Sequence, residues 1–306
     1  MTRPCLVVLV FLTLAASAFA QESPFYEDPG RFKGFKELFG VAEKEPASEE
    51  ELYQQAFSHY QGRPTWLAKR FPERAEKARA NKNLRPFYYR VDYERCIELF
   101  QKLVYEYPFT KHLADVDFYV AESHFKLKEY EVAIAAYQDF LVRHPRDPRA
   151  EYVYYQIGVC HWNNHRKNPL RDQADTEAAV DTFKLLVLLY SGGKYQAEAE
   201  NYIRLGNTNL CDREVGVADF YFKRKQYWSA ILRYRTAWSE YPGAPKAEYA
   251  QFREAVSYDR QGRAGQAVKG FQEYLAAYPE GKYVEEAKNY LGRQSPPGSL
   301  GEETPQ

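Results

Sequence analysis

Cysteine, methionine and net charge are all scarce in this sequence of 306 residues. Four cysteines are too few for a disulfide-linked scaffold. The 42 basic side chains are balanced by 42 acidic ones, whereas a nucleic-acid-binding surface usually shows a clear basic excess. A mean hydropathy of -0.65 excludes a polytopic membrane protein. We therefore expect a soluble, globular chain that binds no nucleic acid.

Recognisable catalytic motifs are missing as well. No GxxxxGK[ST], GxGxxG, GxSxG or HExxH pattern occurs. His161 and His165 have the spacing of two metal ligands on a helix, but no third ligand is obvious, so we interpret them as solvated side chains at a helix end. Asp212 and Glu214 are acids of the kind that suit a helix start. The sequence predicts no enzymatic activity, no cofactor and no metal site.

Residues 1–20 have the pattern of a secretory signal peptide. An apolar run over 5–14 is followed by the small-residue cleavage site Ala18-Phe19-Ala20. Cys5 precedes the apolar run and no cysteine follows it until Cys96, so the sequence has no cysteine where a lipoprotein would carry one. We expect an exported protein without a lipid anchor, with a misassigned start site as the alternative.

A repeat is the main feature of the remaining chain. Tyr-Pro or His-Pro pairs end four apolar-periodic segments, and Pro108 to Pro145 spans 37 residues, as does Pro242 to Pro279. The positions 24, 21, 12 and 8 residues before three of these prolines are small, aromatic or His, small, and aromatic. These positions are Ala121, His124, Ala133 and Tyr137; Ala218, Tyr221, Ala230 and Tyr234; and Ala255, Tyr258, Ala267 and Phe271.

These recurring positions, which we call the repeat column, have a direct structural meaning. Two antiparallel helices cross closely where side chains are small, aromatic side chains fill the space between hairpins, and proline ends the second helix. The 16% of aromatic residues shows no strand-like alternation, which agrees with packing between helices. The pattern resembles the tetratricopeptide repeat. It predicts an all-α, tetratricopeptide-like solenoid of about five helical hairpins.

The domain boundaries follow from where the repeat begins and ends. We expect a signal peptide over 1–20, an N-terminal arm with capping helices over 21–90, the repeat domain over 91–294 and a disordered tail over 295–306. In the first repeat, the partner of the helix that carries Cys96 is expected to run through Leu84 and Phe87. We expect the cysteines of the mature chain to be buried, with at least one unpaired.

Two basic clusters lie outside the repeat column. Arg166, Lys167 and Arg171 fall in an insertion of the third repeat, and insertions in a solenoid usually gather on one face and carry binding. Residues 223–225 are interpreted as a solvated helix end. The inserted loop is therefore the stronger candidate for an interaction site.

Several stretches are similar to the BamD family, the tetratricopeptide subunit of the machinery that assembles β-barrel proteins in the outer membrane. They are Tyr107-Pro108-Phe109, FLVRHPRDPRAEYVYY at 140–155, Arg171-Asp172, and EVGVADFY at 214–221. The resemblance covers 93–291. It implies a non-enzymatic scaffold at the periplasmic face of the outer membrane. Because the family is normally lipid-anchored and this sequence has no cysteine for an anchor, the chain is expected to contact the membrane through its partners, unless the anchor is lost or the start site misassigned.

The resemblance also implies roles for individual residues. Tyr107, Pro108 and Phe109 belong to the half that receives unfolded outer-membrane protein precursors. The half that docks on the barrel-forming subunit contains Arg171, Asp172 and Glu214, and we add Arg166 from the inserted loop. Arg204 joins this set because it lies two residues after position 202, where the family often carries Arg and this sequence has Tyr.

Two other functions fit parts of the sequence. The repeats alone would also suit a periplasmic tetratricopeptide adaptor of another envelope complex, such as the coordinator of the Tol–Pal system. An exported hydrolase with a site not visible in sequence is the third reading. A hydrolase would show a deep pocket with converging acids or histidines, whereas an adaptor would show an open groove.

Overall fold

A computed structural model describes residues 48–81 and 83–294 of the chain, and the described residues from Glu49 onward form one compact unit. The predicted signal peptide, the first part of the arm and the predicted tail lie outside the described residues. No helix among those described is long and apolar enough to cross a membrane.

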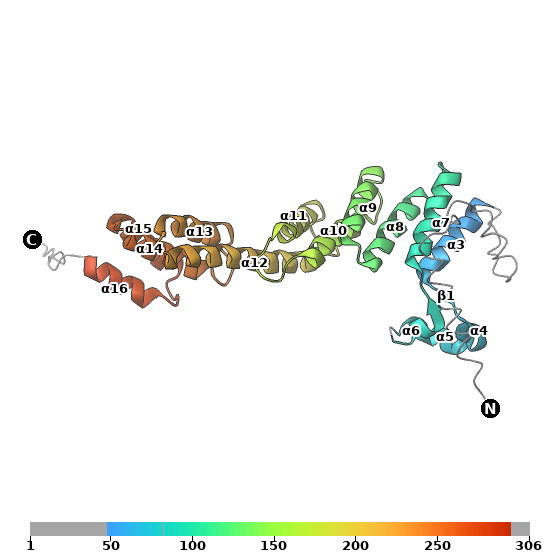
Figure 1. The fold of residues 1–306 in the computed structure, drawn as a ribbon, viewed down its shortest axis with the longest axis horizontal. Helices are drawn as coiled ribbons and strands as arrows, with labels where there is room; N and C mark the ends of the chain where they lie inside the picture. The colour runs from blue at the N-terminus through green and yellow to red at the C-terminus, as the bar shows by residue number, and fades with distance from the viewer. Residues whose placement is uncertain (1–47, 82, 295–306) are drawn as a thin grey trace, which may run out of the picture. The chain divides into compact units, whose positions relative to one another are not determined.

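The described residues fold into a series of helical hairpins (Figure 1). Consecutive helices pack as the pairs α3/α7, α8/α9, α10/α11, α12/α13 and α14/α15, and α16 closes the series against α15. The prediction of a tetratricopeptide-like, all-α solenoid is confirmed. The bounds are α3 Glu49–Gln61, α7 Tyr93–Glu106, α8 Leu113–Leu127, α9 Tyr130–Arg143, α10 Ala150–Asn164, α11 Ala174–Leu189, α12 Gln196–Lys223, α13 Tyr227–Glu240, α14 Ala247–Arg260, α15 Ala264–Ala277 and α16 Val284–Gln294.

A small insert over 63–90 separates the two helices of the first hairpin. It consists of β1 Arg63–Pro64, α4 Trp66–Arg70, α5 Pro72–Arg79, α6 Arg85–Tyr88 and β2 Tyr89–Arg90, and β1 pairs antiparallel with β2. Because the two strands bring the chain back to its point of departure, α7 packs on α3. The predicted partner helix through Leu84 and Phe87 is therefore wrong.

The repeat column forms the core of the solenoid. Its alanines are all fully buried, and so are Tyr137 and Tyr234, while Phe271 is 2% exposed. In the third hairpin, a Cβ added at Gly158 would lie 2.6 Å from the ring of Phe183, so the two helices approach as closely as the sequence predicts. Cys96, Cys160 and Cys211 are buried and unpaired.

Carboxylates that accept hydrogen bonds from tyrosines recur along the solenoid, one of them buried and one half-buried. Glu122 on α8 is 3% exposed and accepts hydrogen bonds from the hydroxyls of Tyr137 (2.5 Å), Tyr152 (2.9 Å) and Tyr60 (3.2 Å). Asp219 occupies the same position two hairpins later, 23 residues before Pro242 as Glu122 is before Pro145. It accepts bonds from Tyr234 and from Tyr249. These carboxylates link neighbouring hairpins through groups buried between them.

The same tyrosines make stability fall at alkaline pH. Burial, followed by the negative charge of Glu122, raises the pKa of Tyr60, Tyr137 and Tyr152 above the ordinary value of 10.0. Above about pH 10 the unfolded chain loses these protons while the folded chain keeps them, so each such tyrosine lowers the free energy of unfolding by about 1.4 kcal/mol per pH unit. Their contribution is fully present below pH 10.

Urea unfolding followed by circular dichroism at about pH 9 and about pH 11 measures this loss. We expect a marked fall in the unfolding midpoint, with tyrosinate absorbance rising together with unfolding for the buried rings. A free energy of unfolding that stays constant across this interval would contradict the prediction.

Helix α12 is a single helix of 28 residues that belongs to two hairpins. Near its start Ala199 packs in one core cluster with Phe183 of α11, and further along Cys211 and Ala218 pack with Ala230 of α13. At Gly206 an added Cβ would lie 2.3 Å from Cγ2 of Val180, so α11 and α12 touch at this glycine.

Candidate functional site

The first candidate site is an open, mostly apolar groove, which we call the N-terminal groove. It lies between α7, α8 and α9, and Phe100, Val104, Val116 and Val120 form its apolar lining. Tyr105 stands at its margin with 87% of its surface exposed. The polar side chains that line it are Gln101, Asp117, Asp139 and Arg143, of which Asp117 and Arg143 form an ion pair of 2.9 Å. Phe100 and Val116 are buried and Val104 and Val120 are half-buried, so the groove has an apolar base with the exposed ring of Tyr105 beside it. An apolar depression of this kind is typical of a contact surface.

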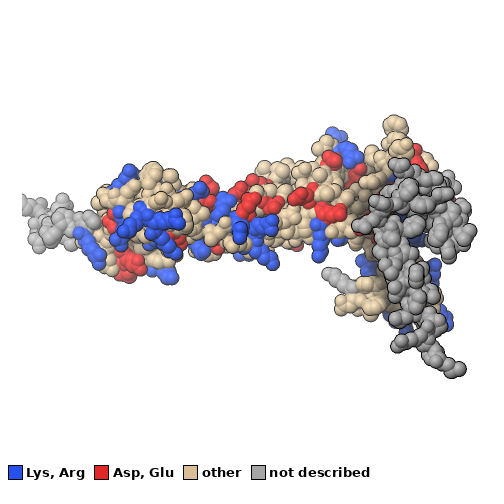
Figure 2. Space-filling view, viewed as in Figure 1, with Lys and Arg blue, Asp and Glu red and all other residues tan. Residues whose placement is uncertain are grey.

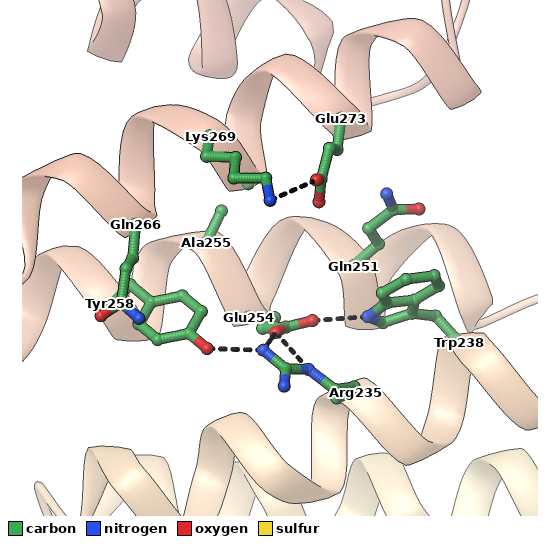
Figure 3. Close-up of a pocket in the computed structure, with 10 residues that line it drawn as sticks. Arg235, Trp238, Gln251, Glu254, Ala255, Tyr258, Gln266, Lys269 and Glu273 are labelled. Carbon is green, nitrogen blue, oxygen red and sulfur yellow. Dashed lines mark hydrogen bonds and ion pairs between the residues drawn. The ribbon is translucent and has the colours of Figure 1, made fainter.

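The second candidate site, the C-terminal groove, lies between α13, α14 and α15 (Figure 3). Glu254 at its base is 7% exposed and accepts hydrogen bonds from Arg235 (2.7 Å) and from the indole of Trp238 (2.6 Å). The hydrogen bond to Glu254 raises the pKa of Arg235 above its ordinary value, so the guanidinium stays charged. Lys269 and Glu273 form an ion pair of 3.7 Å on the facing helix. The lining is therefore charged and hydrogen-bonded.

The two grooves occupy the same place in the repeat. Each is formed by the second helix of one hairpin and both helices of the next. Counted back from the closing prolines, six of the ten lining positions of one groove coincide with lining positions of the other. The pairs are Gln101 and Arg235, Val104 and Trp238, Asp117 and Gln251, Val120 and Glu254, Ala136 and Gly270, and Asp139 and Glu273. The groove at this place in the repeat is therefore lined mainly by apolar side chains near the N-terminal end of the series and by charged side chains near the C-terminal end.

The predicted precursor-binding residues lie just past the end of α7, which contributes to the N-terminal groove. Tyr107 is half-buried, whereas Pro108 and Phe109 are exposed in the turn after the helix. Phe109 is 101% exposed and follows Tyr105 by four residues. Two exposed aromatic rings therefore lie close together in the chain, Tyr105 in the lining of the groove and Phe109 just after the end of α7.

The inserted loop of the third hairpin, residues 165–173, is organised by a residue that the sequence did not point to. Gln173 is 1% exposed, and its amide nitrogen donates to the carbonyl oxygens of Arg166 and Asn168, both at 3.0 Å. Leu170 contacts α12, because a Cβ added at Gly216 would lie 2.6 Å from Leu170 Cδ2. With the backbone held in this way, the predicted docking residues Arg166, Arg171 and Asp172 are all exposed to solvent.

Replacing Gln173 with leucine should release this loop. The substitution leaves two loop carbonyls without their buried donor, and we expect a loss of about 2 kcal/mol in unfolding free energy. Faster amide hydrogen exchange over 166–172 would show the release directly. The exposed Gln272 on α15 provides a matched control, because Gln272→Leu removes no described buried contact. Unchanged exchange in the Gln173 variant would contradict the role assigned to this side chain.

Glu214 is buried rather than presented to solvent. It is 2% exposed, and its two oxygens accept from Arg213 (3.0 Å) and Arg233 (3.0 Å). Arg213 also pairs with Glu177 of α11 at 2.7 Å. This network joins α11, α12 and α13 beside Gly216, where the loop touches α12. Glu214 therefore holds two arginines in place, two residues before the glycine at which the loop touches α12.

Arg204 lies apart from these residues. It is exposed on α12, where it donates to Asn201 at 2.6 Å, and it is ten residues from Glu214, or about 15 Å along the helix. The ring of Tyr202 instead stacks on Phe183 with centroids 4.8 Å apart. Position 202 therefore contributes to the core.

The other residues weighed in the sequence take ordinary structural places. His161 lies 3.4 Å from Asp175, and His165 stacks on Trp162 with ring centroids 4.3 Å apart. Within 48–81 and 83–294, no three His, Cys, Asp or Glu side chains are arranged to hold a metal ion. Residues 223–225 are exposed at the end of α12.

Comparison with known families identifies the chain. A family model described as outer membrane lipoprotein (YfiO) matches residues 85–263, which is more than half of the sequence. The chain belongs to the YfiO, or BamD, family. The resemblance inferred from the residues is thereby confirmed. A tetratricopeptide-repeat model also matches residues 249–281 of this YfiO-family chain, which cover α14 and α15.

Individual relatives of this YfiO-family chain share its sequence at moderate identity. The outer membrane protein assembly factor BamD of Rickettsia prowazekii is 26% identical over 207 residues, which cover 65% of this chain and 80% of that protein. BamD of Caulobacter vibrioides is 23% identical over 169 residues, which cover 55% of this chain and 55% of that protein. A thermophilic tetratricopeptide protein of Thermus thermophilus has a solved structure with 14% identity and a TM-score of 0.28, covering 81% of this chain and 99% of that one.

The match to the YfiO family does not show which residues line the two grooves, and the repeat pattern does not predict them. The lining positions at which the two grooves differ lie between the consensus positions of the repeat, where the repeat pattern does not fix the side chain. A comparison of the positions 4 and 7 residues before Pro108 and Pro242 would have found the contrast, since Val104 and Gln101 stand opposite Trp238 and Arg235.

Proposed function

We propose that this YfiO-family chain is a non-enzymatic adaptor that holds unfolded β-barrel precursors beside the subunit that inserts them. Its role in outer-membrane protein assembly follows from its family. The proposal adds the partners, the surfaces that bind them, and a location in the periplasm at the inner face of the outer membrane. The main support for the proposal is that grooves at the same place in two different repeats have different linings, one apolar and one charged.

The N-terminal groove binds the precursor in this proposal. An unfolded β-barrel precursor presents apolar and aromatic side chains that are not yet buried, and an apolar groove bordered by exposed rings matches them. Val104 and Val120 provide the apolar floor, and Tyr105 and Phe109 provide rings that close over a bound segment. Tyr107 and Pro108 set the turn that holds Phe109 outside the core.

The C-terminal half binds the barrel-forming subunit in this proposal, through the C-terminal groove and the 165–173 loop. The 165–173 loop presents Arg166, Arg171 and Asp172, and the network around Glu214 fixes the surface beside it. Arg204 extends this surface along α12. Preformed charged surfaces of this kind favour a folded partner of complementary charge, because little side-chain entropy is lost on binding.

The test uses a photo-activated crosslinking amino acid at two equivalent exposed positions, Asp139 and Glu273. In cell envelopes, the probe at 139 should capture unfolded barrel precursors, and the probe at 273 should capture a large outer-membrane barrel protein. The double variant Arg171→Ala with Asp172→Ala should reduce recovery of that barrel protein at least tenfold in a pull-down. Lys223→Ala with Arg224→Ala is the control and should leave recovery unchanged.

Two results would contradict the proposal. If both probes capture the same proteins, the two grooves have no separate partners. If Tol–Pal components are recovered without an outer-membrane barrel protein, the chain serves as an adaptor of that other envelope complex.

A further inference from the structure

The insert over 63–90 concentrates the positive charge of a chain that is neutral as a whole. Residues 63–90 contain nine Lys and Arg against two Glu, so the rest of the chain holds 33 basic and 40 acidic residues. All the described Lys and Arg side chains of the insert are exposed, and Figure 2 shows them on its visible margins. The charge of the insert is therefore opposite in sign to that of the remaining chain.

Large apolar side chains of the insert are exposed together with these charges. The exposed fractions are 71% for Trp66, 66% for Phe87, 47% for Leu84 and 40% for Phe71. The backbone brings two of them together, because Thr65 donates from its hydroxyl to the carbonyl of Phe87 (2.8 Å) and from its amide to the carbonyl of Tyr88 (2.8 Å). The residue before Trp66 is thus bonded to the backbone of Phe87 and Tyr88 at the end of the ribbon β1–β2.

Core packing does not explain these exposed side chains. The buried apolar cluster of the insert contains only Ala68, Ala75 and Tyr89 among the described residues, with Tyr88 packed against it. Phe71 is flanked by guanidinium groups instead, since those of Arg70 and Arg74 lie 5.6 Å and 5.4 Å from its ring centroid. Aromatic and apolar side chains next to Arg and Lys are typical of segments that lie in the interface of an anionic bilayer.

We infer that the insert binds the surface of an anionic phospholipid bilayer, with Trp66, Phe71 and Phe87 entering the headgroup region and the surrounding Arg and Lys contacting lipid phosphates. The inference is independent of the proposed adaptor function, because none of these residues lines either groove. It gives the first hairpin a direct contact with a membrane surface. The occupant is a lipid surface rather than an acidic protein, because indole and phenyl rings next to a positive charge match a headgroup layer that is apolar below and anionic above.

Vesicle flotation with the full chain tests this inference. We expect the protein to float with vesicles of phosphatidylcholine and phosphatidylglycerol but to stay behind with phosphatidylcholine alone, and to be released when salt rises from about 0.1 M to about 0.5 M. The triple variant Lys69→Gln, Arg70→Gln, Arg74→Gln should weaken binding roughly 100-fold, since each basic side chain near an anionic surface strengthens binding several-fold. The double variant Trp66→Ala with Phe87→Ala should weaken it even at low salt.

The exposed cluster at the end of α12 is the matched control. Lys223→Gln, Arg224→Gln, Lys225→Gln removes the same number of charges elsewhere and should leave vesicle binding unchanged. Circular dichroism shows whether each variant keeps its helices. Equal flotation with both vesicle types, no flotation at all, or an equal loss in the control would overturn the inference. Capture of an acidic protein by the insert without vesicle binding would assign the surface to a protein partner.

Discussion

Replacing Glu122 with alanine is expected to lower the free energy of unfolding by about 4 kcal/mol. The carboxylate is 3% exposed and accepts from three tyrosine hydroxyls, which come from α3, α9 and α10. Alanine supplies no acceptor and does not fill the volume, so three largely buried hydroxyls lose their partner next to a cavity. Replacing a buried charge can be neutral for stability when the new apolar side chain has the same size, but alanine is much smaller than glutamate.

Urea unfolding of the wild type and the variant measures this change, and Glu98 provides the control. Glu98 is an exposed carboxylate on α7 whose ion pair with Arg95 at 2.7 Å lies in solvent, so Glu98→Ala should cost no more than about 0.5 kcal/mol. Tyr137→Phe removes one donor and should cost about 2 kcal/mol. If Glu122→Ala costs no more than Glu98→Ala, the cluster does not stabilise the fold.

The second large effect is expected at Gly206. An added Cβ would lie 2.3 Å from Cγ2 of Val180, and Val180 is itself 2% exposed. Valine has one preferred rotamer in a helix, so the methyl group cannot turn away and α11 and α12 must separate. Against a gain of up to about 1 kcal/mol in helix propensity, we expect Gly206→Ala to destabilise the protein by about 2 kcal/mol.

The same substitution at Gly265 is the control for this prediction. Gly265 also lies in a helix, α15, but an added Cβ there meets no atom within 4 Å. Gly265→Ala should therefore leave the melting temperature unchanged or raise it slightly. The comparison separates close packing from helix propensity. Equal melting temperatures for the two variants would show that α11 can move away from α12 at little cost.

The sequence predicted the core of the solenoid well where the repeat keeps its period. Ala133, Tyr137, Ala230 and Tyr234 are buried as the column requires, because a position that must be small or aromatic tolerates little else. The pairing of α3 with α7 was not predictable in this way. The insert displaces α3 from its place in the period, and nothing local in α7 indicates that its partner lies on the far side of the insert.

The candidate sites were only partly predictable. The loop residues Arg171 and Asp172 are exposed, as a binding role requires, whereas Glu214 is buried. The sequence alone does not distinguish a buried carboxylate from an exposed one. Glu122 and Asp219 escaped notice because an acid within an apolar-periodic helix usually belongs to its solvated face. A repeated signal does exist: each has a tyrosine 15 residues later and another 30 residues later.

The continuous helix α12 restricts how this part of the chain can change length. One added residue near Asn207 would turn everything after it by about 100° about the helix axis and shift it by about 1.5 Å. The face formed by Cys211 and Ala218 would then no longer meet α13. Seven added residues complete about two turns and restore the phase. Insertions and deletions are therefore compatible with this segment only in steps of nearly whole turns, whereas the 165–173 loop has no such phase to preserve.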